Sequence, residues 1–461
     1  MSDTAPPSAR DVAVNALGDR AGNVTARLDR LLAGASLSPA DKGFAHELVL
    51  GVLRRRLTLQ TVLRAFLERP DRKLPTPLER VLLVAAYQLI FLDKVPDFAA
   101  VNEAVEQAVR FGHRRQSGLV NGLLRGVSRS LSELVPAGAA PAGDVIRISP
   151  GSHKRIGRAV FADPSRRPAE HLSEAFSLPL SLAERWLARQ GGLEAAAELA
   201  MHANARPPLV LRVNRMRASV QDVLDSLAAD GVQARPHANG LSVALMERCE
   251  LTALAAFGRG WVQAQDPTAS AVSIAAAPRP GMRVLDFCAA PGTKTTHLAE
   301  LMDNQGLVTA VDVSQLKLER VRSNCARLGI SIVETVLAGE IGRLSPASYD
   351  LALVDAPCSN TGVLARRPEA RWRFDPAALA ALAGDQLLLV KAAAAFVKPG
   401  GRLVYSTCCI EPEECSDVAQ AASRRIGLRL IDQKLALPTG TDRPEAWADG
   451  GYWAVFAVGR P

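Results

Sequence analysis

The sequence predicts three folded parts: an all-helical N-terminal domain, a small α+β domain, and a C-terminal α/β domain built on a parallel, doubly wound sheet. A length of 461 residues suits about three domains. Residues 8–132 repeat apolar positions at helical spacing, and no alternating strand pattern competes with them. From residue 263 onward, short apolar runs alternate with amphipathic helices, which is typical of a parallel sheet covered on both faces.

The helical domain, residues 1–135, carries most of the excess positive charge. It holds 19 basic and 14 acidic residues, and so accounts for +5 of the chain's net charge of +8. Its basic clusters at 54–56 and 110–115 are compatible with solvated helix ends or with a nucleic-acid surface. Thr76 precedes a proline, and Glu79 follows three residues later, so we expect a capping box at a helix start there.

The middle of the chain divides into a linker and a small domain. Residues 136–168 are rich in Ala, Gly and Pro, and we expect a linker there. Residues 169–262 combine strand-like runs at 209–214 and 241–245 with a helical pattern at 218–229. They form the expected small α+β domain.

The C-terminal domain, residues 263–461, carries the chemistry. Its expected strands are 283–289, 307–313, 332–338, 349–357, 401–409 and 452–459. In open sheets of this kind, ligands bind beyond the carboxyl ends of the strands. Residues at those ends are therefore the candidates for a functional site.

The loop after the first of these strands suits a ligand that approaches the backbone closely. It contains small residues, including Gly292, and a helix begins near Thr293, where N–H groups are free. The loop lacks the glycine patterns of dinucleotide sites and phosphate loops. Asp312 ends the next strand, where an acid can hold ribose hydroxyls or cap a helix. Together these features favour a ligand that contains adenosine.

Two cysteines at neighbouring strand ends indicate covalent chemistry. Cys358 follows the fourth strand together with Asp355, and Cys408 follows the fifth. A lone buried cysteine usually packs, but a pair beside an acid and an arginine-rich loop favours a nucleophile. Such a thiol needs nearby positive charge, because a free thiol has a pKa of about 8.5.

The cysteines do not suit a metal site or a secreted disulfide framework. All seven lie after residue 248, and an odd number clustered late is not a disulfide pattern. There is no C-x2-C pair, and adjacent Cys408 and Cys409 point to opposite sides of an extended chain. The longest apolar run, 81–92, is shorter than the ~20 residues that span a bilayer. We expect a cytoplasmic, monomeric protein without a metal.

Three strings carry a resemblance to a known family. DFCAAPGTKTTHL (286–298), DAPCSNTGVLARRP (355–368) and STCCIEPEE (406–414) occur in this order and spacing. In them the chain resembles the RNA cytosine-C5 methyltransferases, of the RsmB (Sun) type that modifies 16S ribosomal RNA. The resemblance implies a NusB-like RNA-binding domain in the helical part and a class I, Rossmann-like methyltransferase domain at the C-terminus.

The resemblance also implies roles for individual residues. Asp312 would hold the ribose of S-adenosylmethionine, and Glu340 would contact the same cofactor. The cofactor loop would consist of Cys288, Ala289, Ala290, Pro291, Gly292, Thr293 and Lys294. Cys408 would be the nucleophile, Cys358 would assist product release, and Asp355 would lie near the methyl donor and the target cytosine. Arg366, Arg367 and Arg371 would lie near the RNA.

Three positions depart from the family pattern. Thr293 stands where a second glycine is usual, and Glu340 stands where an aspartate is usual. Cys409 replaces the serine that commonly follows the nucleophile. The sequence leaves two alternatives open. One is the same chemistry on transfer RNA, and the other is a non-catalytic RNA-binding or ribosome-assembly factor.

Overall fold

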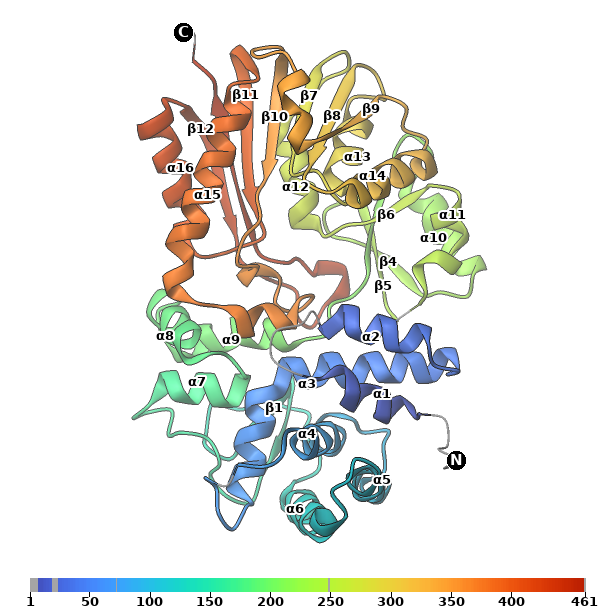
Figure 1. Cartoon of the computed structure of the whole chain (residues 1–461), viewed down its shortest axis with the longest axis vertical. Helices are drawn as coiled ribbons and strands as arrows, with labels where there is room; N and C mark the ends of the chain where they lie inside the picture. Colours follow the sequence, from blue (N-terminus) through green and yellow to red (C-terminus); the bar gives the residue numbers. More distant parts are fainter. Residues whose placement is uncertain (1–6, 19–23, 72, 248, 460–461) are drawn as a thin grey trace. The chain divides into compact units, whose positions relative to one another are not determined.

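The computed structural model describes residues 7–18, 24–71, 73–247 and 249–459, which form two compact units (Figure 1). The first, called the helical unit, extends to Ala205 and includes the distant segment Arg371–Phe374. The second, called the sheet unit, comprises Arg206–Ala370 and the chain from Asp375 onward.

The helical unit begins with six helices, and the all-helical prediction for residues 8–132 is confirmed for the part that is described. These are α1 (Ala9–Ala16), α2 (Val24–Ala33), α3 (Pro39–Ala65), α4 (Thr76–Phe91), α5 (Asp97–Arg110) and α6 (Ser117–Ser130). The predicted capping box at Thr76 is wrong, because Thr76 is already the first helical residue and Pro75 is the cap. Glu79 instead accepts a hydrogen bond from Nε2 of Gln60 on α3, at 2.7 Å.

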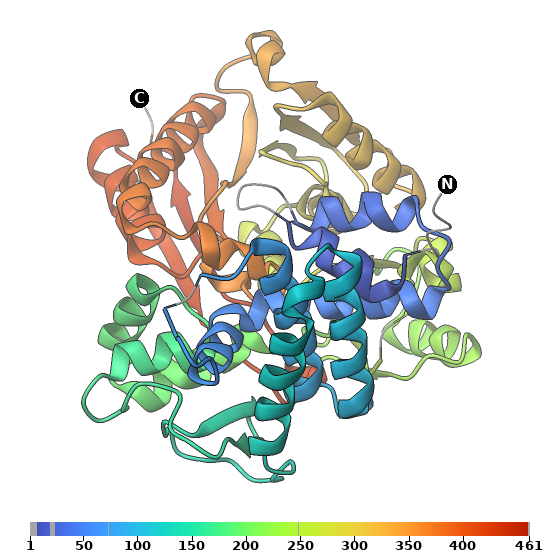
Figure 2. The same ribbon diagram turned by 60° about the horizontal axis from the view of Figure 1, so that its bottom comes forward.

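The segment expected to be a linker, 136–168, contains an antiparallel hairpin. Its strands are β1 (Val145–Ser149) and β2 (Ser152–Arg155), seen at the bottom of Figure 2. Val145 and Ile146 are buried, so apolar burial holds this segment in place. Helices α7 (Pro168–Phe176), α8 (Leu180–Arg189) and α9 (Leu193–Asn204) follow and complete the helical unit. The compact units therefore divide at 205/206, whereas a domain boundary was expected at 168/169.

The segment Arg371–Phe374 is buried in the helical unit although it comes from the C-terminal part of the chain. Arg371 is 0% exposed, and its guanidinium donates hydrogen bonds to acceptors on three separate stretches of the helical unit. The acceptors are the carbonyl oxygens of Arg54, Ser177 and Ala203 and the side-chain oxygen of Asn204. Trp372 Nε1 donates to the carbonyl oxygen of Leu53 at 3.0 Å.

A small antiparallel sheet opens the sheet unit. Its strands are β3 (Val210–Val213), β4 (Ala234–Pro236), β5 (Ser242–Leu245) and β6 (Val262–Ala264), in the order β4-β5-β3-β6. Helices α10 (Val220–Ala229) and α11 (Ala255–Gly258) pack on it through a shared apolar core that includes Leu211, Leu227 and Val243. The small α+β fold predicted for this part of the chain is present.

The larger sheet has seven strands in the order β12-β13-β11-β10-β7-β8-β9. They are β7 (Arg283–Phe287), β8 (Leu307–Asp312), β9 (Val333–Leu337), β10 (Tyr349–Asp355), β11 (Val397–Thr407), β12 (Arg429–Ala436) and β13 (Gly451–Ala457). The five strands from β9 to β11 are parallel, as predicted, whereas β13 runs antiparallel to both β11 and β12. Strand β12 was not predicted, because this edge strand is mostly exposed and offers no apolar run.

Helices cover both faces of the large sheet. The helices on one face are α12 (Pro267–Ala276), α13 (Thr293–Leu301) and α14 (Gln315–Leu328), and those on the other are α15 (Pro376–Ala394) and α16 (Ser416–Ala421). On β10, Leu351 and Leu353 face the first group, while Ala352 and Val354 face the second. The chain runs from β7 outward to β9 and then returns to β10 beside β7, so the loops after these two strands diverge at a switch point.

Within the described residues, α15 is long and apolar enough to cross a membrane by length and composition. Many core helices pass the same test, so this helix alone is weak evidence for a membrane span. In the sheet unit, Val390 and Ala393 of α15 pack into the core beneath β10 and β11.

Candidate active site

Two thiols meet at the carboxyl edge of the large sheet. Cys408 directly follows β11, and Cys358 follows the neighbouring parallel strand β10, whose last residue Asp355 pairs with Ser406. The Sγ atoms of the two cysteines are 3.3 Å apart, and both residues are half-buried. Parallel neighbouring strands place the residues after their carboxyl ends side by side, which is how the sequence brings these two thiols together.

Asn360, which was not predicted from the sequence, links the Cys408 thiol to the backbone of Cys358. Its Oδ1 lies 3.3 Å from the Cys408 thiol, and its Nδ2 donates to the carbonyl oxygen of Cys358 at 2.7 Å. Asn360 adopts a left-handed backbone with φ of +63°, a conformation that asparagine tolerates better than most residues. The motif string contained this asparagine, but only the turn geometry aims its side chain at the Cys408 thiol.

The two thiols differ in their tendency to ionise. The hydrogen bond from Cys358 lowers the pKa of Cys408; burial and Asp355 oppose this shift, while the charges of Arg367 and Lys294 add to it. The pKa of Cys358 is raised well above its ordinary value by that same hydrogen bond, by burial and by the Cys408 charge. These shifts make Cys408 the more readily ionised of the two thiols, while Cys358 keeps its proton to higher pH.

Asp355 lies between the thiols and the loop after β7. Its Oδ2 accepts a hydrogen bond from Lys294 Nζ at 2.6 Å, and its Oδ1 accepts one from Ser406 Oγ at 2.7 Å. Burial alone would lower the pKa of Lys294, but the pairing with Asp355 outweighs burial and raises it. Lys294, expected on the cofactor loop, thus provides a fixed positive charge next to the acid and near Cys408.

The loop from Cys288 to Lys294 is shaped by two left-handed residues. Gly292 has φ of +96°, and a Cβ at this position would lie 3.1 Å from Cγ1 of Val321. Cys288 has φ of +73°, and burial raises its pKa to about 12, which marks it as a neutral thiol. Helix α13 begins at Thr293, so the threonine that departs from the family pattern is accommodated as the first helical residue.

Asp312 is buried at the end of β8 and fastens the same loop. Its Oδ2 accepts the N–H of Ala290 at 3.2 Å, and its Oδ1 accepts the N–H of Ser314 at 3.3 Å. The cap of α14 is Ser314, whose hydroxyl accepts from Lys317 N, so Asp312 is not the N-cap. The remaining lone pairs of the carboxylate are available for ribose hydroxyls.

The surroundings of this loop fit S-adenosylmethionine. Val313, next to Asp312, is 77% exposed and offers an apolar surface for an adenine ring. Asp286 is fully buried beside the loop; burial raises its pKa to about 7, and among the described residues its Oδ1 has no hydrogen-bond partner. Glu340 lies after β9 in a partly exposed turn and pairs with Arg343 at 3.1 Å. Because Glu340 follows β9 and Asp312 ends the neighbouring parallel strand β8, both residues lie at the carboxyl edge of the sheet.

Of the three arginines expected near RNA, the structure leaves one exposed. Arg367 is exposed, and its Nη1 lies 3.3 Å from Oδ1 of Asn360. Arg366 is bound between two buried acids: it pairs with Asp266 at 3.1 Å and with Asp449. The prediction for Arg371 is wrong, because this side chain is fully buried in the helical unit. Sequence alone could not distinguish these neighbours, since all three follow one motif.

The basic clusters of the helical unit are also partly neutralised. Arg54 and Arg55 are buried, and Arg55 stacks 4.7 Å from the ring centroid of Phe91. Arg110 pairs with acids that include Asp11 at 3.0 Å. Of the two original clusters, the exposed side chains include Arg114 and Arg115. Burial, which follows from the packing of α3 against α4, removes most of the first cluster from the surface.

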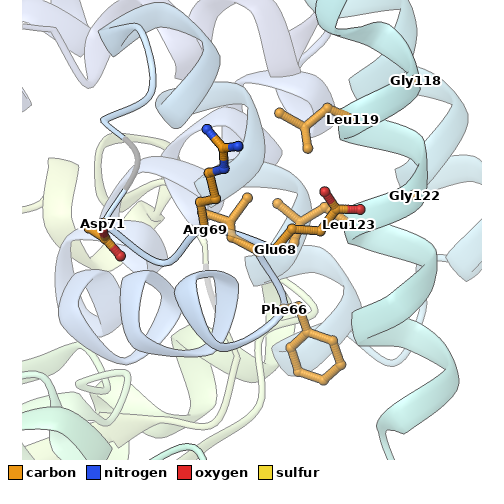
Figure 3. A pocket seen from close by; sticks show the side chains of 9 residues that line it. Phe66, Glu68, Arg69, Asp71, Gly118, Leu119, Gly122 and Leu123 are labelled. Carbon is orange, nitrogen blue, oxygen red and sulfur yellow. The ribbon is translucent and has the colours of Figure 1, made fainter.

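The helical unit also has a hollow of about 960 Å³, shown in Figure 3. It lies beside α6, where Gly118 and Gly122 face open space, and beside the chain that follows α3. Arg69, Glu68 and Asp71 line it together, so its charge is mixed and does not indicate an anionic ligand. Across the described ranges, no group of three or more His, Cys, Asp or Glu side chains is placed to hold a metal ion.

Comparison with known proteins assigns the family. Residues 273–445 match the model of the 16S rRNA methyltransferase RsmB/F family. The chain is 33% identical over 420 residues to the "Probable ribosomal RNA small subunit methyltransferase B" of Bacillus subtilis, which covers 90% of this chain and 88% of the relative. The chain belongs to the RsmB/F methyltransferase family. Its cofactor is accordingly S-adenosylmethionine, as the resemblance implied.

The N-terminal and middle parts of the chain also match family models, and further relatives match most of the chain. Residues 7–129 match the NusB family, and residues 178–251 match the ferredoxin-like domain of the RsmF/B-like methyltransferases. A relative of the same name in Synechocystis is 36% identical and covers 88% of this chain and 87% of the relative. A methyltransferase homolog protein from Pyrococcus horikoshii has a solved structure that is 28% identical, with a TM-score of 0.52, covering 64% of this chain and 99% of that one.

Proposed function

We propose that this protein transfers a methyl group from S-adenosylmethionine to carbon 5 of a cytosine in 16S ribosomal RNA, through a covalent adduct on Cys408. The observation that carries the proposal is the unequal pair of thiols. Cys408, with its lowered pKa, lies 3.3 Å from Cys358, whose pKa is raised, and near the Lys294–Asp355 pair. A thiolate held beside an acid at the edge of a methyltransferase sheet suits attack on an electron-poor ring.

Carbon 5 of cytosine is a poor nucleophile, and the Cys408 thiolate changes this. Its sulfur forms a bond to carbon 6, the aromatic system is broken, and carbon 5 acquires enamine character. When bound, S-adenosylmethionine supplies an electrophilic methyl group, which carbon 5 then takes. Removal of the carbon 5 proton and cleavage of the sulfur–carbon 6 bond restore the aromatic ring and release Cys408.

Cys358 is the group proposed to accept the carbon 5 proton. Its pKa is raised mainly by its contact with Cys408, by burial and by the Cys408 charge. Once the Cys408 sulfur is bonded to carbon 6, that negative charge is gone. Cys358 then loses its proton to water more readily and acts as the base, which accounts for its role in product release.

Asp355 and Lys294 are proposed to hold the other edge of the base. Asp355, held as a carboxylate by Lys294, accepts a hydrogen bond from the exocyclic amino group of cytosine and so orients the ring between Cys408 and the methyl donor. Lys294, whose pKa is raised, stays charged and holds Asp355 in place. Neither residue needs to move for this, because the ion pair is already formed at 2.6 Å.

The substrate class follows from the relatives and from the geometry of the reaction. The names of the relatives refer to the small ribosomal subunit, and the NusB match supports an RNA-binding role for the helical unit. A base must leave its stack to reach both a thiol and a methyl donor, which favours a single-stranded or loop cytosine. We place this activity in the cytoplasm, with a monomeric enzyme.

Incubation of the purified protein with labelled S-adenosylmethionine and either 16S ribosomal RNA or transfer RNA tests the proposal. We expect 5-methylcytosine at a discrete site in 16S RNA, no product with Cys408→Ala, and an accumulated RNA–protein adduct with Cys358→Ala. Methylation of transfer RNA alone would move the activity to that substrate. Strong RNA binding without binding of S-adenosylmethionine in calorimetry would favour a non-catalytic factor.

A further inference from the structure

A fully buried acid, Glu414, joins the two loops that carry the thiols. It lies in the short turn Pro412–Glu414 after β11 and is 0% exposed. Its Oε1 accepts hydrogen bonds from the backbone N–H of Ser359 and from Nε2 of Gln386, both at 2.9 Å. Its Oε2 accepts the thiol proton of Cys409 at 3.0 Å. One carboxylate thus contacts the residue after Cys358 and the residue after Cys408.

Gln386 and Tyr405 support this carboxylate from the core. Gln386 Nε2 also donates to the carbonyl oxygen of Pro357 at 2.9 Å, just before Cys358. The hydroxyl of Tyr405 lies 2.8 Å from Oε1 of Gln386 and 2.7 Å from the carbonyl oxygen of Glu414. Gln386, Tyr405 and Glu414 are each buried, so the hydrogen bonds among them are not exchanged with water and hold a defined geometry.

Cys409 has a place in the same network. It is buried on the side opposite to Cys408, as the extended chain requires, and burial raises its pKa well above the ordinary value. Its sulfur receives hydrogen bonds from the hydroxyls of Ser359 and Thr361, each at 3.3 Å. The neighbour of the nucleophile is therefore a link between the two loops and not a competing nucleophile.

We propose that Glu414 is a positioning residue that fixes the separation of Cys358 and Cys408 through its hydrogen bonds to both loops, and that its charge makes the two thiols unequal in reactivity. The inference rests on the proposed role of Cys408 as nucleophile. The charges around the two thiols differ. Glu414 is one of the charges that raise the pKa of Cys358, whereas Arg367 and Lys294 lower the pKa of Cys408 and Asp355 opposes them. An acid on one side and cations on the other polarise a pair of otherwise equivalent thiols.

Glu414→Gln removes the charge of the side chain and keeps its hydrogen-bonding positions. The amide oxygen still accepts from Ser359 and Gln386, and the amide nitrogen faces the Cys409 sulfur, but the negative charge is lost. Glu414→Ala removes both the charge and the acceptors. Glu413→Gln makes the same chemical change one residue away, in a partly exposed side chain, and serves as the matched control.

The measurement is the rate of alkylation of each thiol by iodoacetamide as a function of pH, resolved by mass spectrometry of the peptides. In the wild type and in Glu413→Gln, Cys408 is expected to react faster than Cys358. In Glu414→Gln the ratio of the two rates falls on the order of tenfold, the change that one unit of relative pKa produces, without loss of melting temperature. Glu414→Ala lowers both the ratio and the melting temperature. An unchanged ratio in Glu414→Gln, or an equal fall in Glu413→Gln, overturns the inference.

The alkylation needs neither RNA nor S-adenosylmethionine, so the two proposals fail separately. Selective alkylation of Cys408 that depends on Glu414, in a protein that methylates no RNA, would remove the proposed function and keep the positioning role. Normal methylation by Glu414→Gln, with an unchanged ratio of the two alkylation rates, would keep the proposed function and remove the positioning role.

Discussion

The backbone N–H of Gly362 donates to the carbonyl oxygen of Cys408 at 3.1 Å, so the loop after β10 is hydrogen-bonded directly to the residue that carries the reactive thiol. Gly450 binds the same loop, because its N–H donates to the carbonyl oxygen of Gly362 at 2.8 Å. Three chain segments thus approach one another at a point that has no space for a side chain.

Gly362→Ala is expected to lower both stability and activity. A Cβ at this position would lie 2.7 Å from the backbone of Gly450 and 2.8 Å from the carbonyl oxygen of Cys408, and backbone atoms cannot yield as a side chain can. Overpacking of this kind costs about 1–3 kcal/mol. The matched control is Gly384→Ala in α15, which has open space and gains about 0.5–1 kcal/mol from helix propensity. Thermal unfolding and methyl-transfer assays measure both effects, and a neutral Gly362→Ala would contradict the packing argument.

Lys294→Gln is expected to slow the reaction by raising the pKa of Cys408. Lys294 is one of two cations whose charge lowers that pKa, and it also holds Asp355 at 2.6 Å. Each unit of pKa increase reduces the thiolate fraction below the pKa by about tenfold, so the rate–pH profile moves toward higher pH. Lys398→Gln removes a similar ion pair, with Asp350, at the opposite end of β10 and should leave the profile in place. A Lys294→Gln enzyme that is slower at every pH by one factor would argue for positioning alone.

The stability of the protein should depend on Asp286 between about pH 4 and pH 7. Burial raises the pKa of this carboxyl to about 7 in the folded protein, above the ordinary value of ~3.9 in the unfolded chain. Below about pH 4 the carboxyl is protonated in both states, and its contribution to stability is fully present. In the window above about pH 4 the folded state retains a proton that the unfolded state has lost, which diminishes this contribution. It falls as the pH rises, by up to about 1.4 kcal/mol per pH unit, and is constant above about pH 7.

Asp286→Asn removes this titration while keeping an acceptor for the Thr295 hydroxyl, which donates to Oδ2 at 2.6 Å. The unfolding free energy of the wild type relative to that of the variant should therefore fall as the pH increases from 4 to 7, because only the wild type loses this contribution. Urea unfolding of both proteins at several pH values gives this difference. A constant difference would mean that Asp286 is ionised in the folded protein throughout the range.

Arg371→Met is expected to destabilise the helical unit without a direct effect on binding of S-adenosylmethionine. The variant removes the donor to four neutral oxygen acceptors, and each buried acceptor that is left unsatisfied costs on the order of 1–3 kcal/mol. Arg373→Met removes the same charge from an exposed position in the same segment and should be nearly neutral for stability. Limited proteolysis of α3 and α9, together with RNA binding, distinguishes the roles. Weaker RNA binding by Arg371→Met at unchanged stability would restore Arg371 as an RNA contact.

Local pattern was sufficient to predict most elements of the fold. Helical periodicity before residue 132 and apolar runs after residue 263 report burial directly, because each depends only on neighbouring positions in the chain. Where burial is weak the pattern is weak too, so the exposed edge strand β12 and the hairpin β1–β2 in an Ala- and Gly-rich segment were missed. Cys358 and Cys408 were recognised because both follow predicted strands.

The partners of the chemical residues were decided by the tertiary structure. The Lys294–Asp355 pair joins residues 61 positions apart, and the Glu414 network depends on α15 as well as on both thiol loops. Arg366, Arg367 and Arg371 follow one motif, yet one pairs with buried acids, one is exposed and one is enclosed in another unit. Sequence by itself determined which strand ends carry reactive groups, since strand alternation is local. Which charges surround each group was decided by strand order and packing, because electrostatic neighbours are set by distance in space and not along the chain.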